Sequence, residues 1–316
     1  MARARICEYP LPGPREIFES TMLNVVTLVS PATIAALDDV LLRRVSQSLP
    51  EVQETAWLDE KLAADIVVAA PVTPALKAHL RNALDGRPID FFVQPLALRR
   101  KKLLVADMDS TMIEQECLDE LADFAGLKAH IAAITARAMH GDIPFEPALR
   151  ERVALLKGLD AHLIGQIIAE RISLTPGAQT LVRTMRAHGA YTVLVTGGFT
   201  AFSRDIASRI GFDADVANVL GMAEGRLNGL IEDPILGRAA KCEVLKRYRK
   251  ELNLSPGETL AIGDGANDLD MLAEAGLGVA FHAKPAVAAA AQARVEHGDL
   301  TALLYAQGYR RAEFVA

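Results

Sequence analysis

The chain has 316 residues, of which 51% are hydrophobic and 23% charged, the composition of a soluble globular protein with a well-filled core. This length predicts about two domains. The net charge of −6 and the isoelectric point near 5.7 argue against nucleic acid or an anionic membrane as the main partner. No stretch approaches about 20 uninterrupted apolar residues, so we expect no transmembrane helix.

The N-terminal segment and the cysteines bear on where the protein works. Residues 1–20 carry arginines near their start but no apolar run after them, so we expect a flexible extension and not a secretory signal. The cysteines Cys7, Cys117 and Cys242 share no CxxC spacing. This argues against a zinc site and favours reduced thiols in a cytoplasmic protein.

Residues 21–97 are expected to form a small α+β domain. Strand-like apolar runs cover residues 22–30, 52–58, 63–70 and 89–95. A first helix is predicted to bury a face made of Ile34, Leu37, Leu41 and Val45. A second is predicted to begin after Thr73, a candidate N-cap, with Pro74 at its first position. The order strand-helix-strand-strand-helix-strand is that of a ferredoxin-like sandwich.

This order of elements also resembles the ACT domain, a small-molecule-sensing module that often pairs with a copy of itself. The resemblance implies that the first domain binds an amino acid such as serine. A purely structural role and a dimerising role are equally open. A dimerising role would make the protein a homodimer.

Residues 98–316 are expected to form a Rossmann-like parallel sheet with helices on both faces. A basic run at 99–102 is predicted to be a solvated linker into this domain. Short apolar strands are then expected at 103–107, 191–196, 259–264 and 277–281. The long segment between the first two strands is predicted to form a helical cap, approximately 112–185. A hairpin is expected at 222–233, with Glu224-Gly225 at its turn.

Carboxylates follow two of these strands at the point where each strand ends. Asp107 and Asp109 end or follow the first strand, and Asp264 and Asp268 follow the third. Ligands of parallel sheets sit outside the carboxyl ends of the strands, so these side chains should meet in one crevice. Any one of them could instead cap a helix, but the four together suit a hard cation such as Mg²⁺.

Three motifs place this half of the chain in a family. DMDST (107–111), TGGF (196–199) and GDGANDLDM (263–271) match the first, second and fourth motifs of the haloacid-dehalogenase-like phosphotransferases, and Lys241 supplies their loop lysine. Over about 103–295 the chain most resembles the phosphoserine phosphatases of that family. One departure is Thr196, which stands where those enzymes usually have serine.

The resemblance implies catalytic roles for three residues. Asp107 would be the nucleophile that forms an aspartyl-phosphate, and Asp109 the general acid and base. Lys241 would hold phosphoryl oxygens together with Thr196 and Gly197. The metal would be Mg²⁺, held by Asp107, Asp109, Asp264 and Asp268, with Asp109 contributing its backbone carbonyl.

The resemblance extends into the cap, where the substrate would be selected. Glu116 would take the ammonium group of O-phospho-L-serine, and Arg152 its carboxylate as a bidentate pair. Met139 and Phe145 would cover the substrate, and Asn267 would reach its phosphate side. Taken without the family, Glu116 and Arg152 are ordinary charged residues of surface helices.

Three other functions are weighed against this one. A nucleotide-binding enzyme is disfavoured because GDGAND has aspartate in place of a third glycine, and the chain contains no GxxxxGK[ST]. A related enzyme that acts on another small phosphomonoester, or passes the phosphoryl group to an alcohol such as homoserine, would share the same intermediate and stays open. An amino-acid-binding regulator with an inactive second half is disfavoured by the intact aspartates and Lys241.

Overall fold

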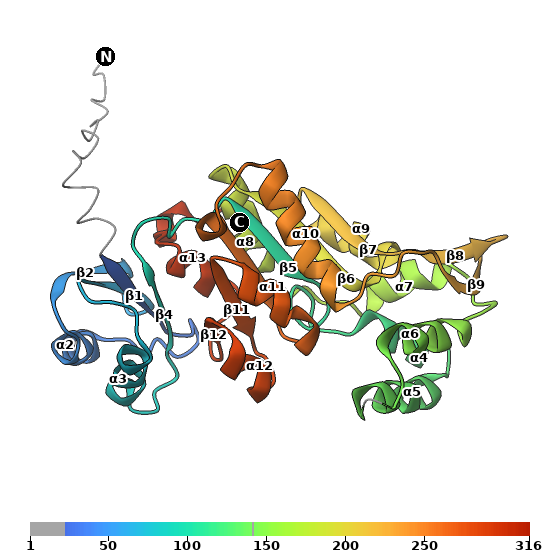
Figure 1. The fold of residues 1–316 in the computed structure, drawn as a ribbon, viewed down its shortest axis with the longest axis horizontal. Helices are drawn as coiled ribbons and strands as arrows, with labels where there is room; N and C mark the ends of the chain where they lie inside the picture. Colours follow the sequence, from blue (N-terminus) through green and yellow to red (C-terminus); the bar gives the residue numbers. More distant parts are fainter. Residues whose placement is uncertain (1–22, 141) are drawn as a thin grey trace, which may run out of the picture.

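The computed structural model describes residues 23–140 and 142–316, except for the side chains of residues 138–140. The extension expected at 1–20 and Cys7 therefore lie outside the described residues. Two main sheets lie side by side, an antiparallel one from the N-terminal part and a larger parallel one, with a group of helices at the far end (Figure 1). Among the described helices, none is both long and apolar enough to cross a membrane.

The N-terminal sheet has the predicted order of elements. Its strands pair antiparallel in the order β2-β3-β1-β4, as in a ferredoxin-like sandwich. The elements in chain order are β1 (Asn24–Val29), α2 (Asp39–Ser48), β2 (Val52–Asp59), β3 (Ala63–Val68), α3 (Pro74–Leu84) and β4 (Asp90–Pro95). Both helices pack on one face of this sheet around a core of aliphatic side chains.

Each of the two helices begins directly after a residue whose side chain caps its N-terminus. The Thr73 hydroxyl accepts a hydrogen bond from the Leu76 amide at 3.1 Å, which confirms the predicted start of α3. In α2 the Asp38 carboxylate caps the helix by accepting from the Leu41 amide at 2.7 Å. Ile34 consequently precedes the helix and is 55% exposed, so its predicted place on the buried face is wrong.

The larger sheet is parallel, in the order β12-β11-β10-β5-β6-β7. Its strands are β5 (Leu103–Asp107), β6 (Tyr191–Phe199), β7 (Ala214–Asn218), β10 (Thr259–Gly263), β11 (Leu277–Phe281) and β12 (Ala293–Val295). Four of them are the predicted strands. The other two, β7 and β12, were not predicted, because both are short edge strands with few buried apolar residues.

Helices cover both faces of the parallel sheet, which confirms the predicted class. Along β5, Leu104 and Ala106 face a core shared with one layer of helices, whereas Leu103 and Val105 face the other layer. The first layer contains α8 (Ala178–Ala187), α9 (Thr200–Ile210) and α13 (Ala302–Ala306), and the second α10 (Arg238–Glu251) and α11 (Leu269–Glu274). A further short helix, α12 (Pro285–Ala290), precedes β12.

Four helices follow β5 where the cap was expected. They are α4 (Cys117–Phe124), α5 (Lys128–His140), α6 (Phe145–Ala154) and α7 (His162–Glu170). The hairpin β8 (Leu220–Ala223) and β9 (Arg226–Ile231) turns at Glu224-Gly225 as predicted and packs against α6. Helices α4, α5 and α6 group at one end of the molecule, opposite the N-terminal sheet (Figure 1).

The basic run at 99–102 is not the solvated linker that we predicted. Arg99 forms an ion pair with Asp65 at 2.7 Å, and its side chain is only 15% exposed. The buried Lys101 amine donates to the carbonyls of Leu98 and Gly257 at 2.9 and 2.8 Å. Arg100 and Lys102 alternate with these two residues and are exposed. The segment therefore runs between two packed bodies, with every second side chain facing inward.

Candidate active site

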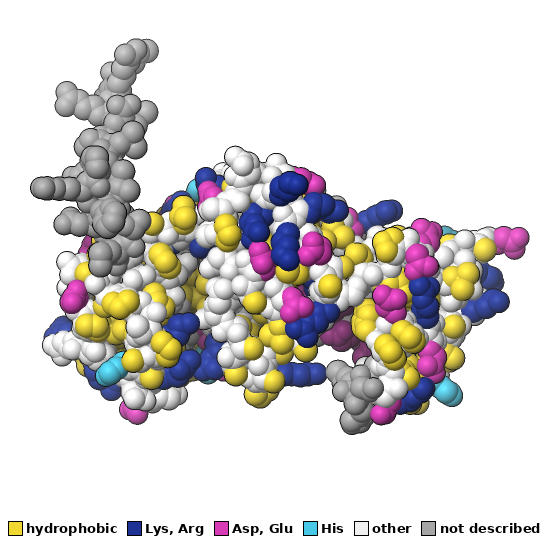
Figure 2. Space-filling model, in the orientation of Figure 1, with side chains coloured by type: hydrophobic (Ala, Val, Ile, Leu, Met, Phe, Trp, Pro, Cys, Tyr) yellow, Lys and Arg dark blue, Asp and Glu magenta, His cyan; other side chains and the backbone are white. Residues whose placement is uncertain are grey.

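Three adjacent strands bring the predicted residues to one edge of the parallel sheet. Asp107 is the last residue of β5, Thr196 lies in the last half of β6, and Asp264 directly follows β10. Because β5 pairs with both β10 and β6, these side chains share one crevice. Figure 2 shows acidic side chains deep in a hollow between the parallel sheet and the helices α4 to α6.

A buried lysine ties two of the aspartates together. Lys241, in the first turn of α10, has its amine 2.6 Å from Asp107 Oδ1 and 2.7 Å from Asp268 Oδ1. Its side chain is 3% exposed. Burial by itself would lower the pKa of Lys241, but the carboxylates of Asp107 and Asp268 outweigh that effect and raise the pKa. Lys241 is therefore a permanent positive charge at the bottom of the crevice.

The acidic residues fit a divalent cation. Carboxylate oxygens of Asp107, Asp264 and Asp268 all lie within 4.8 Å of one another. Burial and then repulsion from Asp268 raise the pKa of Asp264. Asp107 Oδ1 accepts from Lys241 and from the Met108 amide at 2.8 Å, whereas no described donor reaches Asp107 Oδ2. A cation would relieve this crowding of negative charge with oxygen ligands of the kind it prefers.

Asp268 is the most fully occupied of these carboxylates. Its Oδ1 accepts from Lys241, and its Oδ2 accepts from the Gly265 amide at 2.9 Å. It lies at the end of a short 3₁₀ turn, Ala266–Asp268, and is completely buried. Asp268 therefore holds both the lysine and the loop that carries Asp264.

Asp109 is oriented by two hydrogen-bond donors on the other side of the crevice. Its Oδ1 accepts from the Cys117 amide at 2.8 Å, and its Oδ2 accepts from the Thr196 hydroxyl at 2.9 Å. The same hydroxyl accepts from the Gly198 amide at 2.8 Å. The first and second motifs are thus locked together by one carboxylate and one hydroxyl. Thr196 supplies the hydroxyl that serine usually provides in the family.

The two predicted substrate-binding charges come from the helical segment, where the charge of Glu116 acts on Arg152. Glu116 is exposed and accepts a hydrogen bond from the Ser110 hydroxyl at 2.7 Å. Although part of the Glu116 side chain is open to solvent, the protein around its carboxyl group desolvates it, and this effect, followed by repulsion from Asp109, raises the pKa of Glu116 to about 7. Arg152, on α6, is half-buried and donates only to the Ala148 carbonyl and the Thr135 hydroxyl, at 3.3 and 3.5 Å. No described carboxylate lies within ion-pair distance of Arg152, so its guanidinium can still accept an anionic partner.

Of the remaining predicted residues, Phe145 is the one whose contact with the crevice is described. Phe145, 44% exposed, covers the second motif, because a Cβ placed on Gly197 would lie 3.8 Å from its ring. Asn267 is exposed in the loop before Asp268. Met139 lies in α5, but its side chain is outside the described residues. The structure thus gathers side chains from both the sheet and the helical segment, although these are far apart in the sequence.

Asn218, at the end of β7, was not predicted. It is 2% exposed, and its amide group donates to the Gly197 carbonyl at 2.8 Å and to the Leu236 carbonyl at 3.4 Å. Its own oxygen accepts from the Leu236 amide at 2.7 Å. Asn218 therefore joins the second motif to the loop that leads to Lys241. An asparagine at the end of a strand is a sequence feature that could have pointed to it. The strand itself, β7, has too few apolar residues to be predicted.

Comparison with known proteins agrees with this geometry. The haloacid dehalogenase-like hydrolase family matches residues 104–273, more than half of the chain. A phosphoserine phosphatase of Albidiferax ferrireducens is 45% identical over 231 residues, which are 72% of this chain and 98% of that protein. This chain belongs to the haloacid dehalogenase-like hydrolases, in the phosphoserine phosphatase family. The shared motifs are those that line the crevice.

Two further relatives extend the match. A phosphoserine phosphatase of Streptomyces coelicolor is 37% identical over 297 residues, covering 93% of this chain and 72% of that protein, so its similarity includes the N-terminal sheet. A solved structure described as a phospho-aspartyl intermediate analogue of phosphoserine phosphatase superposes with a TM-score of 0.60 at 38% identity. It covers 65% of this chain and 98% of its own. Family membership also implies a metal ion, and the cluster of Asp107, Asp264 and Asp268 has the carboxylate oxygens that could hold one.

Proposed function

We propose that the chain is a Mg²⁺-dependent phosphatase that hydrolyses O-phospho-L-serine to serine and phosphate. The observation that carries the proposal is the presence of two open groups, one in the crevice and one on α6. Asp107 Oδ2 has no described donor, and the guanidinium of Arg152 has no described carboxylate within ion-pair distance. One group suits an attack on phosphorus, and the other suits the carboxylate of an amino acid. Family relatives that carry the name phosphoserine phosphatase support this substrate.

In the first half-reaction, Asp107 Oδ2 attacks phosphorus and the bond from phosphorus to the serine oxygen breaks. Burial raises the pKa of Asp107, whereas Lys241 acts against burial by favouring the ionised carboxylate and holding it in place, and Asp109 gives a proton to the departing serine oxygen. The products are serine and an aspartyl-phosphate on Asp107. The Thr196 hydroxyl and the Gly197 amide, next to Asp109, and the Lys241 amine would hold the phosphoryl oxygens.

In the second half-reaction, Asp109 takes a proton from water, whose oxygen attacks the phosphorus of the intermediate. The bond to Asp107 breaks, so that phosphate leaves and both aspartates return to their starting states. Asp107, Asp264 and the backbone carbonyl of Asp109 would hold Mg²⁺, which would offset the phosphate charge that otherwise repels the nucleophile. A carboxylate oxygen of Asp268 lies within 4.8 Å of those of Asp107 and Asp264, and its bonds to Lys241 and Gly265 make support of these two residues its main role.

The substrate would be enclosed by the helical segment. Glu116 would bind its ammonium group and Arg152 its carboxylate, with Phe145, Met139 and Asn267 around them. We also propose that residues 21–97 and 98–316 are separate domains, ACT-like and catalytic, and that a cap at about 112–185 excludes water while the intermediate exists.

The test of the function is phosphate release from three esters: O-phosphoserine, phosphoethanolamine and 3-phosphoglycerate. We expect strong preference for O-phosphoserine, loss of activity with EDTA, and recovery with Mg²⁺. Equal rates on all three esters would contradict the substrate. Activity that EDTA leaves intact would contradict the metal. Phosphate transferred to homoserine, in place of release, would make the chain a phosphotransferase.

The Arg152→Ala variant tests the carboxylate contact. The variant loses the partly desolvated, charge-assisted pair between Arg152 and the substrate carboxylate. This should weaken transition-state binding by about 2–4 kcal/mol, which is a ~30- to 1,000-fold decrease in kcat/KM for O-phosphoserine. The decrease should be small for phosphoethanolamine, which has no carboxylate. The matched control is Arg150→Ala on the same helix, where Arg150 pairs with Asp233 at the surface. A decrease that is equal for every ester would make Arg152 a structural residue.

A further inference from the structure

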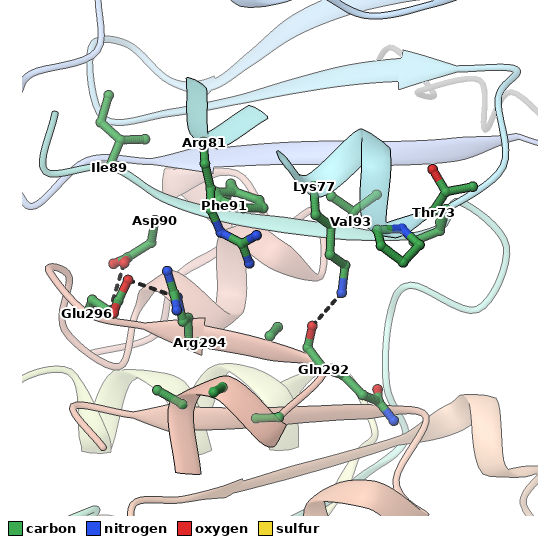
Figure 3. Close-up of a pocket in the computed structure, with 16 residues that line it drawn as sticks. Thr73, Lys77, Arg81, Ile89, Asp90, Phe91, Val93, Gln292, Arg294 and Glu296 are labelled. Atoms are coloured by element: carbon green, nitrogen blue, oxygen red, sulfur yellow. Dashed lines mark hydrogen bonds and ion pairs between the residues drawn. The ribbon is translucent and has the colours of Figure 1, made fainter. Parts of the chain in front are cut away.

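A second cavity lies between the N-terminal sheet and the parallel sheet. Its volume is about 340 Å³, which is within the range of small-molecule sites. It opens between α3 and β4 on one side and α12 and β12 on the other (Figure 3). None of the active-site residues named above lines it.

Basic side chains enter this cavity from both of its sides. Lys77 and Arg81 reach in from α3, and Arg294 faces them from β12 (Figure 3). The only acidic lining residues are Asp90 and Glu296, so the lining has a net charge of 3 − 2 = +1 in a chain whose net charge is −6. This part of the surface therefore has the opposite sign to the protein as a whole.

Both acidic residues are already engaged. The Asp90 carboxylate accepts from the Glu296 amide at 2.8 Å and from the Gly298 amide at 2.7 Å. Glu296 pairs with Arg294 at 2.9 Å. On the other side of the cavity, the Lys77 amine donates to the Gln292 carbonyl at 2.7 Å, which leaves its charge unpaired. Glu296 thus neutralises Arg294, and no carboxylate of the lining forms an ion pair with Lys77 or Arg81.

Arg81 is the least satisfied of the basic residues. Its exposed side chain makes no hydrogen bond and no ion pair with the described residues, and its guanidinium lies 5.8 Å from the centre of the Phe91 ring. The proximity of Arg81 also contributes, after desolvation, to a lowered pKa of Lys77, so two like charges are held together here. Around them the lining is apolar, with Val72, Pro74, Phe91 and Val93.

We propose that this cavity binds a small organic anion, with an acidic group between Arg81 and Lys77 and an aromatic or aliphatic body against Phe91 and its apolar neighbours. Two like charges held beside an aromatic ring favour such a ligand, because the anion relieves their repulsion and the body displaces water from apolar surface. The ligand would contact both sheets at once, so binding should also strengthen their association.

The probe for this site is naphthalene-2-sulfonate, which has one anionic group and a planar apolar body but no phosphate or amine. Its affinity for the full-length protein is measured by titration calorimetry. We expect saturable binding of one molecule per chain, a higher melting temperature, and weaker binding as salt rises. Arg81→Gln should lower the affinity at least ~10-fold, because a charged hydrogen-bond donor is lost. Uncharged 2-naphthalenemethanol should bind more weakly than the sulfonate.

Three matched variants decide where the probe binds. Arg44→Gln removes an exposed arginine from the other N-terminal helix and should leave affinity unchanged. Phe91→Leu keeps the charges but removes the ring, and should also weaken binding. Asp107→Asn alters the active site and should not affect the probe. Equal affinity of the wild type and Arg81→Gln, or binding lost in Asp107→Asn, would overturn the proposal without touching the proposed phosphatase activity.

Discussion

Carboxylates are buried beside basic side chains in two regions of this molecule. The two regions differ in whether every carboxylate oxygen accepts a hydrogen bond. In the junction between the sheets, formed by Asp65, Asp90 and Arg99, the protein fills every carboxylate oxygen. Asp65 accepts from two nitrogens of Arg99 and from Thr27, and Asp90 accepts from the backbone of 296–298. In the crevice, Asp107 Oδ2 has no described donor, although Lys241 lies 2.6 Å from the other oxygen.

This difference separates stability from chemistry. A buried ion pair whose hydrogen bonds are complete fixes the arrangement of the parts that it joins. A cluster with an open oxygen and excess negative charge keeps a place for a cation and a phosphoryl group. Substitutions in the junction should therefore change unfolding, and substitutions in the crevice should change turnover.

The strongest test of this comparison is Asp107→Asn. Because an amide cannot attack phosphorus, we expect a loss of about 10⁴-fold or more in turnover, while the fold is kept. Phosphate release and thermal melting measure the two properties. Acid-labile phosphate on another residue of this variant would contradict the assignment of the nucleophile.

Arg99→Met should have the converse effect. It leaves the Asp65 carboxylate buried with Thr27 as its remaining partner, so unfolding in urea should be easier by about 2–4 kcal/mol. Turnover at low temperature should stay near that of the wild type. The control is Lys102→Met, where a 62% exposed lysine pairs with Glu258 and the cost should be below about 1 kcal/mol. Equal costs for both would show that the junction adds nothing to stability.

Asn218→Ala probes a residue that supports the crevice without facing the substrate. Its removal leaves the Gly197 carbonyl and the Leu236 backbone without their partner. We expect kcat to fall about 10- to 100-fold with little change in KM, because the second motif and the Lys241 loop lose their alignment. Asn228→Ala in the hairpin is the control. A rise in KM with unchanged kcat would instead place Asn218 in substrate binding.

The smallest expected effect is a pH dependence from Glu116. Its pKa is raised to about 7, so the side chain is protonated below that pH and binds an ammonium group only above it. For O-phosphoserine, kcat/KM should therefore rise about 10-fold from pH 6 to pH 8. Glu116→Gln should remove this rise, and 3-phosphoglycerate, which has no amine, should not show it. A rise that persists in the variant would assign the titration to another group.

The sequence by itself determined the order of elements in the N-terminal sheet, four strands of the parallel sheet and the position of the aspartates at the strand ends. A strand that ends in Asp107 and a strand followed by Asp264 are local patterns, and parallel strands necessarily meet at one edge of their sheet. Lys241 came from the family resemblance, since a lone lysine that opens a helix has no local signature.

Only the tertiary structure decided which polar side chains are buried. Arg99 looked like part of a solvated linker, yet it bonds to Asp65, 34 positions away, and Asn218 bonds to Gly197, 21 positions away. The cavity at Arg81 needs residues from α3 and from β12, which only the packing of two sheets brings together. A short stretch of sequence fixes which atoms can donate and accept hydrogen bonds. The whole fold determines which hydrogen-bond partner offsets the cost of burying a polar group.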